Sequence, residues 1–319
     1  MVSRRDWLRI TAGASAALSL NPRILEALQS RELITRAVPS SGERLPVIGL
    51  GGANTFSETA SREDFTAIRG VLQSLVDGGG TVFDTAAGYG ASEEVSGQVA
   101  QEAGIAGRIF WATKVNVAGG RGGGRGSVDP AAVRAQIERS FTRLRIPVID
   151  AIQVHNMGDP PTQLGVLKEL KAAGRIRYLG ITTTSENQYT ALAHVMRNEP
   201  LDFIGIDYAV DNRVAEEVVL PLAQERRIGV LVYLPFGRSR MWARIGDRPL
   251  PEWAAELDAR TWAQFMLKFV IAHPAVTVAC PGTSDPEHMI DNLAGGLGRI
   301  PNAEQLGRMV RLVESLPAA

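Results

Sequence analysis

The sequence predicts a single-domain α/β protein with the (β/α)8 TIM-barrel fold, and two patterns lead to this prediction. Short apolar runs rich in valine and isoleucine alternate with amphipathic segments of helix length from residue 45 to residue 316, which favours a parallel sheet with helices between its strands. Most runs are apolar at consecutive positions, as is typical of strands covered on both faces. The alternative, a doubly wound sheet, normally has a G-x-G-x-x-G turn after its first strand. The only candidate, residues 49–54, lacks the third glycine.

Eight apolar runs are the expected barrel strands. They cover residues 45–51, 81–85, 108–115, 149–155, 176–182, 201–208, 228–234 and 276–280. Helices are expected over residues 61–77, 127–144, 161–174, 185–198, 211–227, 261–273 and 302–316. Ser61 is the candidate N-cap of the first helix, and Asp129 before Pro130 is a typical start for the second. Long loops follow the third and seventh strands, at the end where such barrels carry their chemistry.

Composition and charge exclude several classes of function. The chain has 319 residues, enough to bury a core without disulfides or metals. Lys plus Arg and Asp plus Glu both total 34, so no charge excess favours a nucleic acid or an anionic membrane as a partner. The single cysteine, Cys280, cannot form an internal disulfide, and its apolar neighbours predict a small buried side chain. The four histidines lack the spacing of metal ligands, so no metal site is expected.

The N-terminus has a pattern of its own. Residues 3–9, SRRDWLR, resemble the twin-arginine motif Ser-Arg-Arg-x-Phe-Leu-Lys, and a mildly apolar stretch follows over residues 10–20. This stretch is too short for a stable membrane span, which needs about 20 residues; the alternative is a surface helix with a basic start. We therefore expect a signal segment and linker over residues 1–40, a barrel over residues 41–319, and the twin-arginine export machinery as a partner. The protein would then be periplasmic or otherwise extracytoplasmic, and cytoplasmic if the signal is not used.

Four polar residues are expected at one end of the barrel. Asp84, Lys114 and His155 each end an apolar run, and Tyr89 lies in the loop just after the run that Asp84 ends. Each has an ordinary explanation when taken alone, such as a helix cap, a solvated lysine or a packed tyrosine. Because the carboxyl ends of parallel strands meet at one mouth, we expect the four side chains to lie together.

The chemistry of these four side chains is mutually consistent. A phenol is a weak acid at neutral pH, and a nearby ammonium ion makes its phenolate easier to form. A carboxylate beside the lysine would hold it charged and in place, and a histidine could hydrogen-bond the substrate oxygen. The residues therefore predict that Tyr89, assisted by Lys114 and Asp84, protonates an oxygen on which negative charge develops.

The chain resembles the aldo-keto reductases from about Leu45 to Leu316. The segment FDTAAGYGASEEVSG (83–97) is similar to the family motif FDTA-x-x-YG-x-SE-x-x-LG, and YLGIT, YLPFGRS and PGTSDPEHMIDNLAG follow in family order. The resemblance implies a (β/α)8 barrel that transfers a hydride between a nicotinamide cofactor and a small carbonyl or alcohol substrate. It places Asp84, Tyr89, Lys114 and His155 on the family's catalytic tetrad. It implies NADP more often than NAD as the cofactor.

The resemblance also assigns a cofactor site, with departures from the family pattern. Thr182 and Thr183 stand where the family usually has Ser-Asn, and Gly205 stands where a glutamine is common. Ser284 and Asp285 follow Thr283 where the family often has a lysine or arginine for the 2′-phosphate, which makes NAD a real option and is also compatible with a tightly held cofactor. Tyr233 has the position of the aromatic residue that stacks on the nicotinamide ring. The full set of expected cofactor residues is Thr182, Thr183, Asp207, Tyr233, Leu234, Pro235, Gly237, Gly282, Thr283, Ser284, His288, Asp291 and Asn292.

Two other functions remain open at this point. A lyase or epimerase could use the same tetrad for proton abstraction on a barrel with a tightly bound cofactor, and a non-catalytic barrel could keep the fold alone. The substrate pocket is also undecided. Phe56, Trp242 and Trp253 are candidates for an apolar wall. Arg238, Arg240 and Arg244 are candidates for contact with an anionic group, with the cofactor diphosphate or with solvent.

Overall fold

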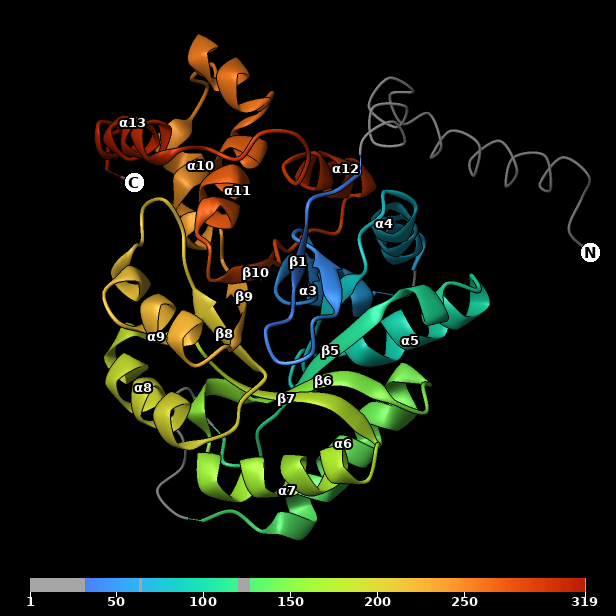
Figure 1. The fold of residues 1–319 in the computed structure, drawn as a ribbon. Helices are drawn as coiled ribbons and strands as arrows, with labels where there is room; N and C mark the ends of the chain where they lie inside the picture. The colour runs from blue at the N-terminus through green and yellow to red at the C-terminus, as the bar shows by residue number, and fades with distance from the viewer. Residues whose placement is uncertain (1–31, 63–64, 120–126, 319) are drawn as a thin grey trace, which may run out of the picture.

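A computed structural model describes residues 32–62, 65–119 and 127–318, and its centre is a ring of eight parallel strands (Figure 1). Each strand pairs with the next in chain order, and bridges between Ile48 and Ala279 and between Gly51 and Gly282 close the ring. This confirms the (β/α)8 barrel. The strands are β3 (Leu50–Gly51), β4 (Val82–Asp84), β5 (Phe110–Val115), β6 (Ile149–Val154), β7 (Ile176–Thr183), β8 (Phe203–Asp207), β9 (Gly229–Tyr233) and β10 (Val276–Ala279).

Helices surround the strands, as Figure 1 shows. The α-helices among the described residues are α3 (Thr55–Ala60), α4 (Thr66–Asp77), α5 (Ser92–Glu102), α6 (Pro130–Leu144), α7 (Pro160–Ala172), α8 (Tyr189–Asn198), α9 (Val219–Glu225), α10 (Arg240–Ile245), α11 (Trp262–Ala272), α12 (Pro286–Ala294) and α13 (Ala303–Glu314). Short 3-10 helices cover Ala106–Arg108, His155–Met157, Glu186–Gln188, Val214–Glu216, Gly237–Ser239 and Glu252–Leu257.

The two predicted N-cap residues, Asp129 and Ser61, differ in outcome. Asp129 caps α6 as expected, because its side chain accepts a hydrogen bond from Ala131 N at 2.9 Å. The expectation for Ser61 was wrong. Ser61 follows the last residue of α3, and its hydroxyl donates back to Ser57 O at 2.8 Å. It therefore ends one helix rather than beginning α4.

A hairpin covers the end of the barrel where the strands begin. β1 (Thr35–Ala37) pairs antiparallel with β2 (Arg44–Pro46), so the first expected run is divided between β2 and β3. The Arg36 guanidinium donates to the carbonyls of Ile271, His273 and Val276 at 2.5, 2.6 and 2.5 Å. Because these carbonyls lie at the end of α11 and the start of β10, Arg36 ties the hairpin to the barrel.

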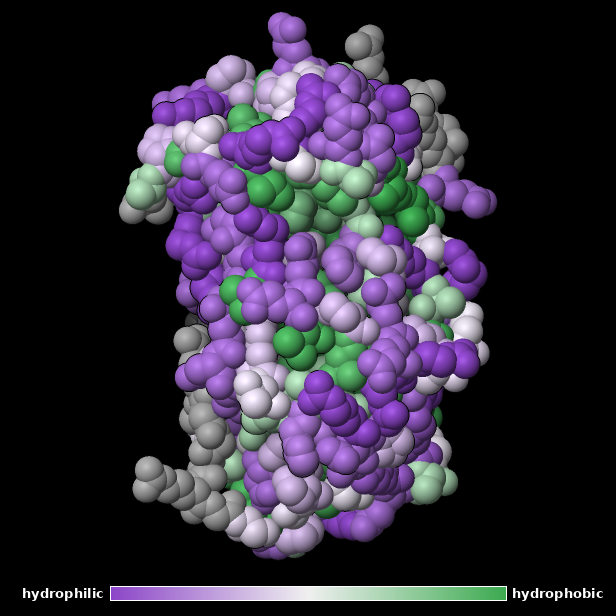
Figure 2. All heavy atoms as spheres, turned by 60° about the vertical axis from the view of Figure 1, so that its left-hand side comes forward, coloured by the Kyte–Doolittle hydropathy of each residue, from purple (hydrophilic) through white to green (hydrophobic). Residues whose placement is uncertain are grey.

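The core has two layers. One lies between the strands and the helices, and the other fills the barrel interior with side chains that include Val82, Phe110, Phe203 and Leu231. Figure 2 shows a mostly hydrophilic face, on which hydrophobic side chains gather in small separate groups. Within the described part of the chain, no helix has the length and hydropathy needed to cross a membrane.

Candidate active site

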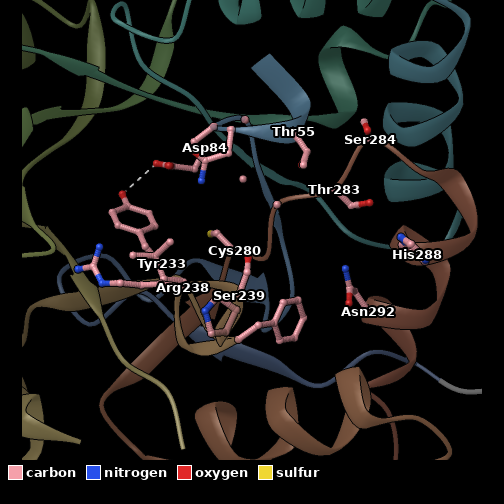
Figure 3. Close-up of a pocket in the computed structure, with 18 of the residues that line it drawn as sticks. Thr55, Asp84, Tyr233, Arg238, Ser239, Cys280, Thr283, Ser284, His288 and Asn292 are labelled. Carbon is pink, nitrogen blue, oxygen red and sulfur yellow. Dashed lines mark hydrogen bonds between the residues drawn. The ribbon is translucent and has the colours of Figure 1, made fainter. Parts of the chain in front are cut away.

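A cavity of about 1160 Å3 opens where the strands end. Residues that follow β3, β4, β6, β7, β9 and β10 form its wall, so it lies at the mouth expected for a barrel of this class (Figure 3). Asp84, Tyr89 and His155 line it, and Lys114 lies behind Asp84. The structure therefore brings the four predicted residues together.

Asp84 and Lys114 form a buried ion pair in the barrel interior. Lys114 Nζ donates to Asp84 Oδ2 and, at 2.8 Å, to the carbonyl oxygen of Thr85. The side chains of Lys114 and Asp84 are only 1% and 4% exposed. Burial raises the pKa of Asp84, and the Lys114 charge opposes that effect. Burial is the largest single effect on Lys114 and would lower its pKa, but the groups around it, Asp84 first, together raise the pKa overall, so Lys114 remains an ammonium ion.

Tyr89 and His155 lie above this pair. The Tyr89 hydroxyl is 3.4 Å from His155 Nε2, and the two rings meet edge to face with centroids 5.5 Å apart. Lys114 Nζ is 5.2 Å from the centre of the Tyr89 ring. The Asn116 side-chain amide donates to the His155 carbonyl at 2.9 Å and so fixes the backbone at the end of β6. A polar group on a bound ligand can reach both Tyr89 and His155 from the cavity.

Asp84 also makes a second set of contacts, which its place in the sequence did not predict. Its Oδ1 atom accepts a hydrogen bond from the Tyr233 hydroxyl at 3.0 Å and a longer one from Gln153 Nε2 at 3.4 Å. Gln153 Nε2 also donates to the Tyr233 oxygen at 3.0 Å. The sequence does carry a signal for Gln153: it is a polar residue inside an apolar run, two positions before His155, and therefore on the same face of the strand.

Comparison with known proteins agrees with this geometry. The sequence profile of the Aldo/keto reductase family matches residues 47–305. The chain belongs to this family.

Named relatives and solved structures support the assignment. Aldo-keto reductase YhdN of Bacillus subtilis is 31% identical over 207 residues, which are 62% of this chain and 60% of that protein. Aldo-keto reductase yakc [NADP(+)] of Schizosaccharomyces pombe is 30% identical, again over 62% of this chain and 60% of that protein. The alignments thus span about three fifths of the curated relatives. An aldo-keto reductase from Klebsiella pneumoniae, solved in complex with NADPH, is 26% identical, with a TM-score of 0.70 over 88% of this chain and 96% of that one.

Most of the residues that the family resemblance assigned to the cofactor line the cavity of this aldo/keto reductase. They are Thr182, Tyr233, Leu234, Pro235, Gly282, Thr283, Ser284, His288, Asp291 and Asn292. Figure 3 shows Thr283, Ser284, His288 and Asn292 along one side of the cavity, at a distance from Asp84 and Tyr233. The cavity therefore joins the tetrad to the region that the resemblance assigns to the adenosine.

Three of the expected cofactor residues lie outside the cavity wall. The Thr183 hydroxyl bonds to Gln188 at 2.5 Å and accepts from Ser185 N at 3.0 Å, which turns it into the loop before α8. The Asp207 side chain is 1% exposed and lies 2.8 Å from Arg238 Nη2. Gly237 has a left-handed backbone, and a Cβ atom there would lie 2.3 Å from the Asp211 carboxylate.

The loop after β9 suits an anionic group. Gly237, Arg238 and Ser239 have φ values of 57°, 55° and 67°, so the chain makes a tight turn beside the cavity. Arg238 also lines the cavity and is the only lysine or arginine among the described residues of its wall. These features fit a dinucleotide diphosphate. No described lysine or arginine lines the wall near Ser284 and Asp285, where a 2′-phosphate would be expected.

Several expectations about the substrate wall were wrong. Phe56 is fully buried against Phe83, with ring centroids 5.1 Å apart, because α3 turns it into the core. Trp253 packs on Phe265 instead of facing the cavity. Of the three candidate aromatic residues, only Trp242 lines the cavity.

Of the three candidate arginines, too, only one lines the cavity. Arg240 pairs with Asp211 at 3.1 Å, and Arg244 donates to the Val313 carbonyl at 2.6 Å, so both have protein partners outside the cavity wall. Arg238 alone of the three reaches the cavity. Cys280 is buried as expected, at 4% exposure, although it also contacts the cavity.

Asn54 and Asn156 were not predicted, yet both line the cavity with left-handed backbones, at φ values of 50° and 55°. Non-glycine residues adopt this conformation rarely, and such strain gathers at functional sites. Each lies two or three residues after the end of a strand, and this position is the feature of the sequence from which their place at the cavity could have been predicted. Among the described residues, no group of three or more His, Cys, Asp and Glu side chains could hold a metal ion.

Proposed function

We propose that this aldo/keto reductase transfers a hydride between NADP(H) or NAD(H) and a small carbonyl or alcohol substrate, with Tyr89 as the general acid and base. One observation carries the proposal: Tyr89 and His155 present polar atoms 3.4 Å apart to the cavity, above the buried Asp84–Lys114 pair. An acid, an orienting group and an electrostatic support thus meet at one point.

The protein residues supply the proton chemistry. When bound, the nicotinamide ring supplies the hydride that the carbonyl carbon accepts. Tyr89 donates its proton to the carbonyl oxygen as negative charge develops there, and His155 orients that oxygen. Lys114 stabilises the phenolate that remains, while Asp84 holds Lys114 in place. In alcohol oxidation the Tyr89 phenolate takes the proton back.

Both nicotinamide cofactors are compatible with the family. The names of the yeast relative and of the Klebsiella structure refer to NADP(+) and NADPH, which supports NADP. The wall near Ser284 and Asp285 has no described lysine or arginine for a 2′-phosphate, which supports use of NAD as well. Side-by-side titration of NADH and NADPH, followed through quenching of tryptophan fluorescence, measures the preference.

Replacing Tyr89 with Phe tests the catalytic role. Loss of a general acid typically lowers the rate about 10^2- to 10^4-fold, whereas cofactor affinity should stay within about twofold, because the ring remains. The measurement is NAD(P)H consumption with a panel of aldehydes, beside fluorescence titration of the cofactor. Undiminished turnover in Y89F would contradict the role of Tyr89.

The same panel separates the alternatives. Turnover that requires no net oxidant or reductant would favour a lyase or epimerase with a tightly bound cofactor. Absence of both turnover and cofactor binding would favour a non-catalytic barrel.

We also propose that the part of residues 1–40 that precedes β1 (Thr35–Ala37) is a twin-arginine signal segment, and that it directs the protein to the periplasm; β1 itself pairs with β2 and belongs to the barrel rather than to a linker. Residues 1–31 lie outside the described part of the chain, so the support is the SRRDWLR pattern. Cell fractionation of the wild type and of an R4K/R5K double variant tests this. The wild type should be extracytoplasmic and the variant cytoplasmic; equal cytoplasmic distribution would exclude export.

A further inference from the structure

Tyr233 spans the floor of the cavity and contacts the catalytic ion pair. It ends β9, yet its hydroxyl reaches Asp84 Oδ1 on β4 at 3.0 Å, as the dashed line in Figure 3 shows. Lys114 Nζ lies 4.8 Å from the centre of its ring. Asp84 thus uses one oxygen for Lys114 and the other for Tyr233.

The space for Tyr233 comes from a glycine on the neighbouring strand. A Cβ atom at Gly205 would lie 2.4 Å from Tyr233 Cε2 and 2.6 Å from its hydroxyl oxygen. Gly180, on the strand beside it, is different, because an added Cβ there would lie 2.4 Å from the Phe203 carbonyl oxygen and only 3.0 Å from Gln153 Cγ. The absence of a side chain at position 205 therefore makes room for the hydroxyl group that donates to Asp84.

We propose that Tyr233 is a positioning residue whose hydroxyl holds the Asp84 carboxylate charged and directed at Lys114, and that Gly205 is required for this placement. The proposal rests on the proposed function, because the benefit of a fixed Lys114 is the acid chemistry of Tyr89. It adds a role to the ring of Tyr233, which lines the cavity and remains free to contact a cofactor.

The burial of Asp84 explains why the Tyr233 hydroxyl matters as a hydrogen-bond donor in addition to Lys114. Burial raises the pKa of Asp84, and the hydrogen bonds from Lys114, Tyr233 and Gln153 lower it. Each donor that is removed makes the neutral acid easier to form, and a neutral Asp84 no longer anchors Lys114. The titratable groups that face this site from the surrounding elements are Lys114, Tyr89, Tyr233 and Cys280.

The first test is Y233F, which keeps the ring and removes the hydroxyl. We measure kcat against pH with NADPH and 4-nitrobenzaldehyde as the probe carbonyl. The acidic limb should move up by about one to two pH units, the equivalent of one hydrogen bond to a charged group, while NADPH affinity stays within about twofold. A profile that superimposes on that of the wild type, or a loss of NADPH binding in Y233F, would overturn the proposal.

Two further variants make the result specific. G205A keeps the hydroxyl but displaces it, so it should reproduce the shift of Y233F. Y178F is the matched control, because Tyr178 also donates to a carboxylate, Glu43 at 2.5 Å, but at the opposite end of the barrel. Y178F should leave the acidic limb in place. A shift in Y178F, or none in G205A, would count against the assignment.

Urea unfolding tests the hydrogen bond without any substrate. Y233F should raise the unfolding equilibrium constant about tenfold or more at pH 8, and this difference should shrink as the pH falls and Asp84 becomes protonated. A difference that is the same at pH 8 and at the lowest pH at which the wild type remains folded would overturn the proposal. If the wild type turns over no carbonyl at all, the proposed function fails, whereas this measurement still decides the role of Tyr233.

Discussion

Each end of the barrel carries a phenol, a carboxylate and a cation in contact, but in different settings. At the mouth, Tyr233 donates to Asp84, which pairs with Lys114. At the base, Tyr178 donates to Glu43, which pairs with Arg177 at 2.6 Å. The side chains of the upper ion pair are 1% and 4% exposed, whereas those of Arg177 and Glu43 are 43% and 31% exposed.

This difference in exposure distinguishes the ion pair that we propose to act in catalysis from one that only joins parts of the fold. Taking both charges of a pair out of water costs several kcal/mol, and the attraction between them often only offsets that cost. The base avoids the cost by leaving its charges near water, where they help to join the hairpin to β7. At the mouth both charges are buried despite this cost, and the result is an ammonium ion held in a fixed position beside Tyr89.

The largest test of this comparison is K114M against R177M. K114M leaves the Asp84 carboxylate buried without its cation, which should lower the free energy of unfolding by about 3–5 kcal/mol. R177M should cost less than K114M, because Arg177 and Glu43 are partly solvated, although it also removes a partner of Asp150, whose side chain is 15% exposed. Urea unfolding measures both, and the D84N/K114M double variant should recover part of the loss. Equal effects of K114M and R177M would show that burial does not distinguish the two ends.

The tetrad could be predicted from the sequence because each of its strand residues interrupts an apolar run at its end. Parallel strands of one barrel deliver such ends to one mouth, so spacing along the chain was enough. The hydroxyl contact of Tyr233 could not be predicted in this way. It depends on the missing side chain of Gly205, which is a neighbour only in the folded sheet.

The errors have a related cause. Phe56 is a candidate for the cavity wall in the sequence, but α3 forms around it and turns its side chain into the core. Trp253 lies in a 3-10 helix, Glu252–Leu257, within a segment expected to be a loop. Aromatic residues in the loops after the strands therefore did not predict the cavity wall well, because short helices in these loops decide whether a side chain faces the cavity or the core.

The two ends of β8 offer a second, smaller comparison, and it depends on pH. Asp202, just before β8, accepts hydrogen bonds from Lys171 Nζ at 2.5 Å and Leu179 N at 2.9 Å. Asp207, at the other end, has no well-aligned hydrogen-bond donor to its buried oxygens, although Arg238 lies close. Burial raises the pKa of Asp207 to about 6.

The sign of the resulting pH effect follows from proton binding. Between the usual pKa of about 4 and the raised value, the folded state holds a proton that the unfolded state has lost, so Asp207 makes the protein less stable as the pH rises. Two pKa units correspond to about 3 kcal/mol. Relative to the wild type, D207N should therefore gain up to about 3 kcal/mol in free energy of unfolding from pH 4 to pH 7. The control, D202A, removes the one oxygen that accepts both bonds and should be destabilised at both pH values; a pH-independent difference for D207N would contradict the argument.

The smallest expected effect lies at the rim of the mouth, near α12. Unlike the floor, this region has few contacts that a substitution would break: the His288 side chain is 73% exposed, and Asp285 is 49% exposed while it caps α12 through Glu287 N at 2.8 Å. S284R adds a cation and keeps the Asp285 cap. Because an exposed ion pair contributes about 1 kcal/mol or less, the affinity for NADPH should rise up to about fivefold, with NADH unchanged. Fluorescence titration at two salt concentrations measures this, and the gain should shrink at high salt. An equal gain for both cofactors would show that residue 284 is not near the 2′-phosphate, and that the adenosine end of the cavity lies elsewhere.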